Sequence, residues 1–99
     1  MKLIMEVRVD IDLESESEFN EWYNNVHIPA IVNCPGFISG RRYRSIRGEP
    51  MYLALYEIES VEALKSSRFE EESGWEQFEG RIKNFSWNLY TQLHEYIKE

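Results

Sequence analysis

The 99-residue sequence lacks the features that define several large protein classes. Its single cysteine, Cys34, excludes an intramolecular disulfide, and no apolar run approaches the roughly 20 residues that cross a bilayer. The first residues lack the apolar stretch of a signal peptide, so we expect a cytoplasmic protein. A glycine-rich phosphate loop and a spaced set of metal ligands are also missing, and we expect no nucleotide cofactor and no metal site.

Basic residues are scarce as well, with 11 Lys and Arg against 18 Asp and Glu and a formal net charge of -7. This charge repels phosphate backbones and anionic membranes. The one basic cluster alternates along a predicted strand and is therefore divided between its two faces; it comprises Arg41, Arg42, Arg44 and Arg47. We expect neither nucleic acid nor a membrane as a partner.

Aromatic residues, in contrast, are abundant. Phe, Trp and Tyr make up 14% of the chain and hydrophobic residues 42%, a composition typical of a folded globule. A chain of this length forms a single domain, residues 1–99, and buries enough surface for one layer of helices on a sheet. Dimerisation would relieve this limit.

The first part of the chain predicts a strand followed by a helix. Residues 2–10 alternate apolar and polar side chains, the period of a strand. Ser15 and Glu18 form a capping-box pattern, after which apolar residues recur at helical spacing. We expect a change in the helix at Pro29, because proline has no N–H to donate, and an end at the turn 34–36.

The remainder predicts a hairpin, two helices and a last strand. Residues 37–47 and 51–58 read as an antiparallel hairpin at the centre of the sheet. A short helix begins at Ser60, helical spacing recurs over 68–83, and 85–97 alternates again. The order of elements is that of the ferredoxin-like βαββαβ fold, an α+β class in which helices cover one face of an antiparallel sheet.

The other face of this sheet requires a partner, because several predicted strands carry apolar or aromatic residues on both faces. A second copy of the sheet is the simplest one. Two sheets packed about a twofold axis would form a barrel-like homodimer that encloses a cavity.

His27 is the strongest candidate for chemistry. It lies near the end of the amphipathic helix, four positions after Tyr23, so the two side chains share one side of the helix. An imidazole with a pKa of about 6.5 can accept or donate a proton at neutral pH. The alternative is a structural histidine that caps backbone carbonyls at the helix end.

Tyrosines form the second candidate group. Strand alternation places Tyr52 and Tyr56 on one face, where they would line an aromatic pocket or a dimer interface. Arg41 has the same strand parity as Tyr43 and would bind an anionic group or lie at the surface. Three further residues are candidates with a core or solvent-facing alternative; they are Trp22, Trp87 and Asn88.

Several motifs occur in order along the chain, and they comprise Phe19, Trp22, Tyr23 and Val26 to Pro29, then Pro35 to Phe37, Arg41 to Tyr43 and Tyr52 to Glu57. Together they resemble the EthD-like group of the dimeric α-β barrel superfamily. The resemblance implies a ferredoxin-like protomer, a homodimer and a pocket between sheet and helices, with His27 and Tyr43 at the pocket. Relatives of this group commonly have an acidic residue just after the His-x-Pro element, where this chain has Ala30.

These observations predict a small-molecule enzyme, a cofactor-independent cyclase, isomerase or dehydratase acting on an aromatic or polyketide-like substrate. His27 would transfer a proton and Tyr43 would polarise a carbonyl. The substrate would lie against Trp22, Tyr23, Arg41, Tyr52, Tyr56, Trp87 and Asn88. Two alternatives stay open: a non-catalytic ligand-binding or assembly module, and a monooxygenase that is cofactor-free or haem-dependent, with His27 as the haem ligand.

Overall fold

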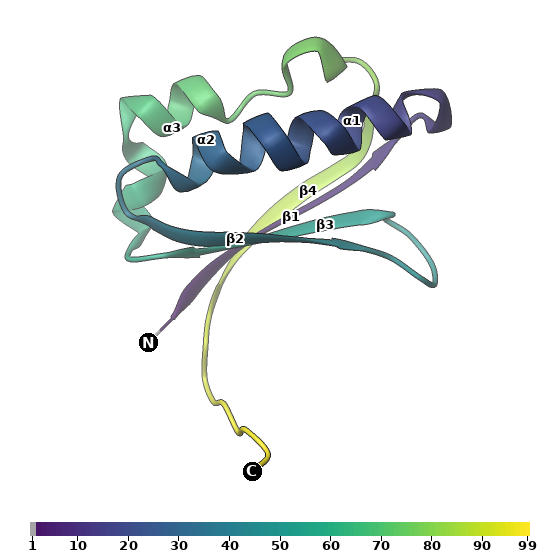
Figure 1. The fold of residues 1–99 in the computed structure, drawn as a ribbon. Helices are drawn as coiled ribbons and strands as arrows, with labels where there is room; N and C mark the ends of the chain where they lie inside the picture. Colours follow the sequence, from purple (N-terminus) through teal and green to yellow (C-terminus); the bar gives the residue numbers. More distant parts are fainter. Residues whose placement is uncertain (1) are drawn as a thin grey trace.

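The computed structural model describes residues 2–99 and consists of a four-stranded sheet with helices on one face (Figure 1). All strand pairs are antiparallel, and the order is β2-β3-β1-β4. The strands are β1 (Leu3–Ile11), β2 (Phe37–Arg44), β3 (Tyr52–Ile58) and β4 (Ile82–Thr91). The predicted ferredoxin-like α+β fold is confirmed. None of the helices within residues 2–99 is able to span a lipid bilayer.

The first helical region is continuous but changes its winding in the middle. It consists of α1 (Glu16–Trp22), a π-helical turn η2 (Tyr23–His27) and α2 (Ile28–Val32), preceded by the short 3-10 turn η1 (Leu13–Ser15). The N–H of Ile28 bonds the carbonyl of Tyr23, the five-residue spacing of a π turn. The change predicted at Pro29 therefore lies one turn earlier, and α2 continues through the proline.

The predicted capping box at Ser15 does not form. The Ser15 side chain makes no capping hydrogen bond to α1, and its Oγ instead accepts one from Arg81 Nη1 at 3.3 Å. The start of the helix near residue 15 is nevertheless where the sequence predicts it.

The hairpin of β2 and β3 is displaced from its predicted central position. Strands β1 and β3 occupy the centre because β1 pairs with both β3 and β4, which leaves β2 at an edge. Alternation along β3 buries Tyr52, Ala54 and Tyr56 under the helices, whereas Leu53 and Leu55 lie half-buried on the open face. The sheet therefore has one covered and one uncovered face.

The second helical region is more broken than predicted. It contains the 3-10 turn η3 (Val61–Lys65), the helix α3 (Ser67–Glu72) and a second 3-10 turn η4 (Glu76–Phe78). The predicted helix over 68–83 ends before Gly74, and β4 begins at Ile82. Beyond Thr91 the chain leaves the sheet as a tail, 92–99, on the side away from the helices (Figure 1).

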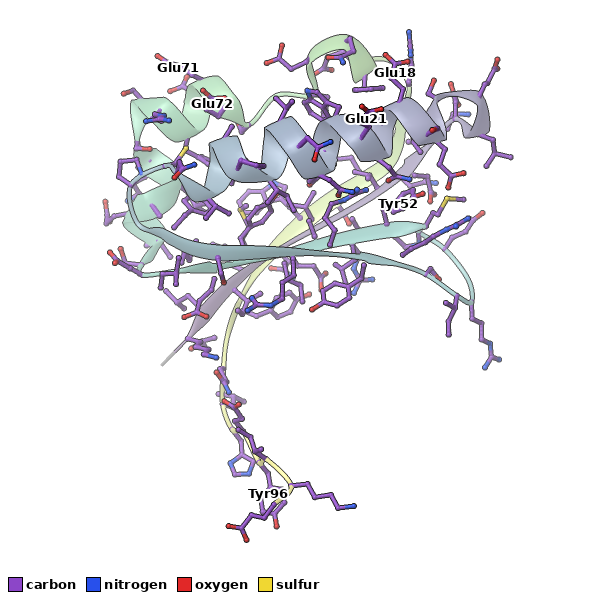
Figure 2. The ribbon with its side chains drawn as sticks, viewed as in Figure 1. Glu18, Glu21, Tyr52, Glu71, Glu72 and Tyr96 are labelled. Atoms are coloured by element: carbon purple, nitrogen blue, oxygen red, sulfur yellow. The ribbon has the colours of Figure 1, made fainter. Side chains whose placement is uncertain are left out.

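The core is an aromatic layer between helices and sheet. Phe19 and Phe78 are completely buried, and their rings meet edge to face at 5.2 Å. Acidic side chains lie on the outer side of the helices, where Glu18 and Glu71 point away from the sheet (Figure 2). The abundance of aromatic residues in the sequence is thus used to build the interior.

Candidate functional site

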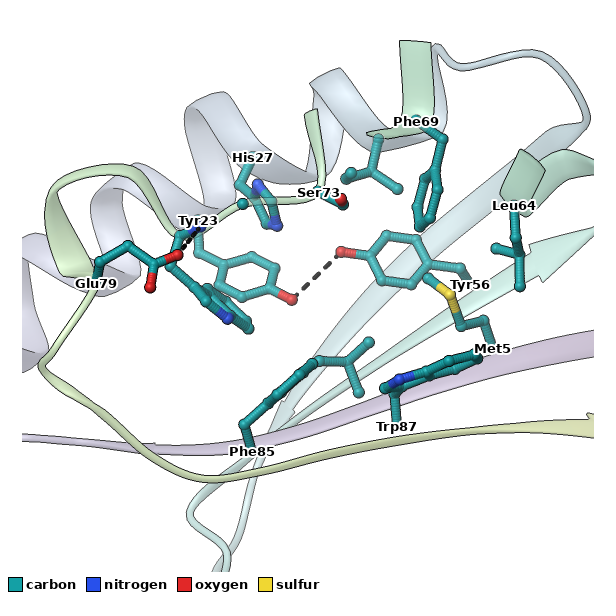
Figure 3. Close-up of a pocket in the computed structure, with 14 residues that line it drawn as sticks. Met5, Tyr23, His27, Tyr56, Leu64, Phe69, Ser73, Glu79, Phe85 and Trp87 are labelled. Carbon is teal, nitrogen blue, oxygen red and sulfur yellow. Dashed lines mark hydrogen bonds between the residues drawn. The ribbon is translucent and has the colours of Figure 1, made fainter. Parts of the chain in front are cut away.

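A cavity of about 420 Å³ lies between the helices and the sheet (Figure 3). Its wall on the sheet side comes from β1, β3 and β4, with Met5, Tyr56 and Trp87 among the lining residues. The opposite wall comes from η2, α2, η3 and α3 and from the segment between α3 and β4. The cavity thus has one wall from the sheet and one from the helical layer.

His27 borders this cavity and is only 6% exposed. Trp22 stacks on its ring at 4.6 Å between centroids, and Trp75 lies at 5.6 Å. The edge of the imidazole meets Tyr23 at 4.8 Å and 90°. The wide π turn carries Trp22 and His27, five residues apart, to the same side of the helix.

Burial makes His27 a neutral imidazole at physiological pH. Desolvation by burial, followed by the positive charge of Arg42, lowers the pKa of His27 from 6.5 to about 4. Within the described chain, no residue forms a hydrogen bond with its ring nitrogens, so His27 is not a carbonyl cap. A neutral, unpaired nitrogen beside a cavity is suited to accept a proton from a ligand.

Two tyrosine hydroxyls meet in the same cavity. Tyr56 Oη donates to Tyr23 Oη at 3.3 Å, and both side chains are buried (Figure 3). Burial raises the pKa of Tyr56 and of Tyr23 above the usual value, so both hydroxyls stay protonated. Because Tyr23 accepts the hydrogen bond from Tyr56, its own hydroxyl hydrogen is available to an oxygen of a ligand.

Arg42 packs against the ring of Tyr23 and is not among the residues that line the cavity. Its guanidinium carbon lies 4.2 Å from the centroid of the Tyr23 ring, a cation–π contact. Nη1 donates to Asn24 and Nη2 to Asn20, both at 2.9 Å, while the buried Nε has no hydrogen-bond partner. Burial lowers the pKa of Arg42, yet a guanidinium stays charged in proteins.

Arg42, and not Arg41, is therefore the arginine close to the site. Arg42 pairs with Ala54 on the covered face of the sheet, whereas Arg41 and Tyr43 pair with Leu55 and Leu53 on the open face. The sequence showed that these side chains alternate along the strand, but it did not show which of them face the helices. The expected meeting of His27 with Tyr43 in one pocket does not occur within this chain, because the sheet lies between them.

The other predicted site residues divide between three locations. Trp87 lines the cavity, and Trp22 lies behind His27 in the core. Tyr52 is buried outside the cavity, where its hydroxyl donates to Glu16 and accepts from Asn20. Asn88 pairs with Glu6 across β1 and β4 and lies on the open face.

Glu79 also lines the cavity, although its side chain is exposed to solvent. Its carboxylate accepts a hydrogen bond from the backbone N–H of Trp75 at 3.3 Å (Figure 3). The expected helix over 68–83 ends before Gly74, and Glu79 follows the turn η4. No local pattern in the sequence indicated that Glu79 would border the cavity.

The described residues 2–99 hold no group of three His, Cys, Asp or Glu side chains arranged around a metal ion. A haem iron needs one axial ligand, often an unprotonated imidazole. His27 provides a neutral imidazole at the cavity wall, so its chemistry fits that role.

The fold of this chain is shared by several solved structures of low sequence identity. SnoaB from Streptomyces nogalater, a cofactor-independent oxygenase, superimposes with a TM-score of 0.74 at 14% identity over 98% of both chains. The haem degrader MhuD from Mycobacterium tuberculosis, with two haems in its active site, gives 0.73 at 16% over 95% of this chain and 98% of MhuD. An EthD family protein from Bacillus halodurans gives 0.70 at 13% over 94% of this chain and 100% of that protein. The resemblance to the EthD-like group is thereby confirmed at the level of the fold.

The chain belongs to the family described as a domain of unknown function, DUF4286, which matches residues 2–99. The comparison with curated proteins gave no match.

Proposed function

We propose that this protein is a cofactor-independent enzyme that acts on a small aromatic or polyketide-like carbonyl compound by proton transfer. Cyclisation, isomerisation and dehydration all begin with such a step. The observation that carries the proposal is a neutral, unpaired His27 beside a protonated tyrosine pair in an aromatic cavity. Tyr23 takes the role of hydrogen-bond donor that the sequence suggested for Tyr43.

The shape and lining of the cavity favour a flat apolar ligand. Its volume of about 420 Å³ falls in the range of about 300 to 1,000 Å³ that small-molecule sites occupy. Trp75, Phe85 and Trp87 offer ring surfaces for stacking. The polar groups are few, and they converge near His27 and Tyr23.

The proton transfer follows from the positions of these groups. The unprotonated His27 nitrogen accepts a proton from a carbon beside a carbonyl, and the electron pair moves to the carbonyl oxygen. The Tyr23 hydroxyl donates a hydrogen bond to this oxyanion. The imidazolium that forms lies between the rings of Trp22 and Trp75, which stabilise a cation through their faces.

The strength of the base narrows the substrate class. A base works best when its pKa is close to that of its task, and a His27 pKa of about 4 makes it a weak base. Such a base suits an acidic C–H, above all one between two carbonyls. Polyketide-like compounds carry this 1,3-dicarbonyl unit.

The test measures the rate at which the keto and enol forms of 1-phenylbutane-1,3-dione, an aromatic 1,3-diketone, reach equilibrium. The ultraviolet absorbance of the enol monitors this reaction. We expect the protein to accelerate relaxation, His27→Gln to abolish the acceleration, and Tyr23→Phe to reduce it about ten-fold or more. His94→Gln is the matched control, since His94 lies exposed in the tail. Acceleration that survives in His27→Gln would refute the role of His27, and binding without acceleration would refute catalysis.

The fold neighbours support a small-molecule function in general terms. SnoaB is a cofactor-independent oxygenase and MhuD degrades haem, so the same fold holds organic molecules of different chemistry. The neutral imidazole of His27 also favours haem binding as a second candidate function. Titration with haem tests this: a Soret band that is lost in His27→Ala would identify His27 as the ligand.

We propose in addition that a second copy of the chain covers the open face of the sheet. Leu53 and Leu55 lie on this face, together with Tyr43 at 47% exposure and Tyr90 at 45%. These apolar and aromatic side chains alternate with the charged Glu6, Arg8 and Arg41, a mixed composition that interfaces between proteins also have. Tyr43 would then contact the partner protomer.

Analytical ultracentrifugation tests this proposal, because it measures the oligomeric state of the protein in solution. The unmodified protein should be a dimer, and Leu55→Arg should be a monomer because it places a charge in the interface. Val61→Arg is the control, since Val61 is exposed on η3 on the helical side. A monomeric wild-type protein at micromolar concentrations would contradict the proposal.

A further inference from the structure

We propose that the cavity admits uncharged aromatic carbonyl compounds and disfavours their carboxylate analogues, because its wall has no cation, and that Glu79 adds to this selectivity. This inference rests on the proposed function and specifies its substrate class. Two observations support it: the charges of the residues that line the cavity, and the position of Arg42 behind the ring of Tyr23.

The wall of the cavity offers no positive charge to an anionic ligand. None of the 14 lining residues within the described chain is a lysine or an arginine. His27 is neutral at physiological pH because burial disfavours its charged form. A ligand carboxylate would therefore lose part of its hydration without gaining a counter-ion, which is unfavourable even in a cavity that is partly open to solvent.

Arg42 cannot provide this counter-ion. The ring of Tyr23, which does line the cavity, covers its guanidinium at 4.2 Å. Its two terminal nitrogens are held by the side-chain oxygens of Asn20 and Asn24, at 2.9 Å each. The positive charge thus acts on the tyrosine and not as a ligand-binding group.

Glu79 adds a negative charge to the wall. Its carboxylate is held by the backbone N–H of Trp75, and the Trp75 ring lies 5.6 Å from His27 (Figure 3). Glu79 is exposed to solvent, so its repulsion of a second negative charge a few ångströms away is screened and changes affinity about two- to five-fold. An uncharged ketone of the same shape avoids this repulsion.

A matched pair of probes separates charge from shape. 2-Acetylnaphthalene carries a methyl ketone where 2-naphthoate carries a carboxylate. Binding of either probe to the cavity should quench the fluorescence of Trp75 and Trp87, which line its wall. We expect the ketone to bind at least about ten-fold more tightly. Glu79→Gln should tighten naphthoate binding several-fold and leave the ketone unchanged.

Glu76→Gln is the control, because Glu76 is exposed on η4 and does not line the cavity. Glu79→Ala is a second variant that removes the charge without the amide. Equal affinity for both probes, or an unchanged ratio in both Glu79 variants, would overturn the inference. If neither probe binds, the inference and the ligand-binding part of the proposed function both fail. Selective binding with no loss of enolisation in His27→Gln would refute the catalytic proposal alone.

Discussion

Replacing His27 by glutamine should make the stability of the protein less dependent on pH. In the folded chain the pKa of His27 is lowered from 6.5 to about 4, mainly because burial removes water from the charged form. The unfolded chain exposes the imidazole and restores its ordinary pKa. Between these two pH values the unfolded state binds a proton that the folded state does not.

The direction of the effect follows from this difference. Stability from the neutral His27 is present above about pH 6.5 and is lost as the pH falls toward about 4, since protonation then favours the unfolded chain. One pKa unit corresponds to about 1.4 kcal/mol, so between about pH 7 and about pH 4.5 the loss amounts to about 2 to 3 kcal/mol. This is a large part of the stability of a small domain.

Urea unfolding of the wild-type protein and of His27→Gln over this pH range measures the effect. Carboxylates also titrate there, but they contribute equally to both proteins, and the difference between the two curves isolates His27. The variant should lose stability at neutral pH, since it alters a packed ring, and should then decline less on acidification. His94→Gln should follow the wild-type curve. Parallel curves for wild type and His27→Gln would show that His27 is not held neutral in the fold.

Two further predictions concern Arg42 and a glycine turn. In Arg42→Met the pKa of His27 should rise, but by less than the full shift because burial is the larger cause. Arg42→Lys keeps the positive charge and is the control, and proton NMR titration of the imidazole measures the pKa in both variants. An unchanged pKa in Arg42→Met would exclude the electrostatic effect of Arg42 on His27. Gly36→Ala should destabilise by about 2 kcal/mol or more, since Gly36 has φ +86° and a Cβ there would lie 2.8 Å from Ala63 Cβ. Gly80→Ala has a similar φ of +85° but free space, so its smaller loss in urea should report backbone strain alone. Equal losses at the two glycines would disprove the clash.

Local patterns were sufficient to predict the order of the elements. Alternation over residues 2–10 and 51–58 and helical spacing after Ser15 each depend on neighbouring residues, and the structure has strands and a helix in these places. The alternation that put Tyr52 and Tyr56 on one face also holds. The π turn η2 was not predicted, because no residue preference distinguishes it from the α-helix around it.

The differences between the expected and the observed positions of the candidate site residues have one physical origin. Which face of a strand is buried depends on the element that covers it, and that contact joins residues far apart in the chain. For this reason the sequence showed that Arg42 points to the opposite face from Arg41 and Tyr43, but it did not show which face lies under the helices. Arg41 and Tyr43 were therefore expected in the pocket in place of Arg42. Glu79 was missed in the same way, since its direction depends on the break at Gly74.

The sequence by itself therefore determined an α+β fold with a ferredoxin-like order and a histidine on an amphipathic helix, because periodicity and turn residues act over short distances. Only the tertiary structure decided the surroundings of that histidine. It brought the Trp75 ring from another segment to 5.6 Å from His27, joined Tyr23 to Tyr56 across the layer, and placed Arg42 against Tyr23. These are packing contacts between distant parts of the chain, and they change His27 from an ordinary titratable group into a buried neutral imidazole.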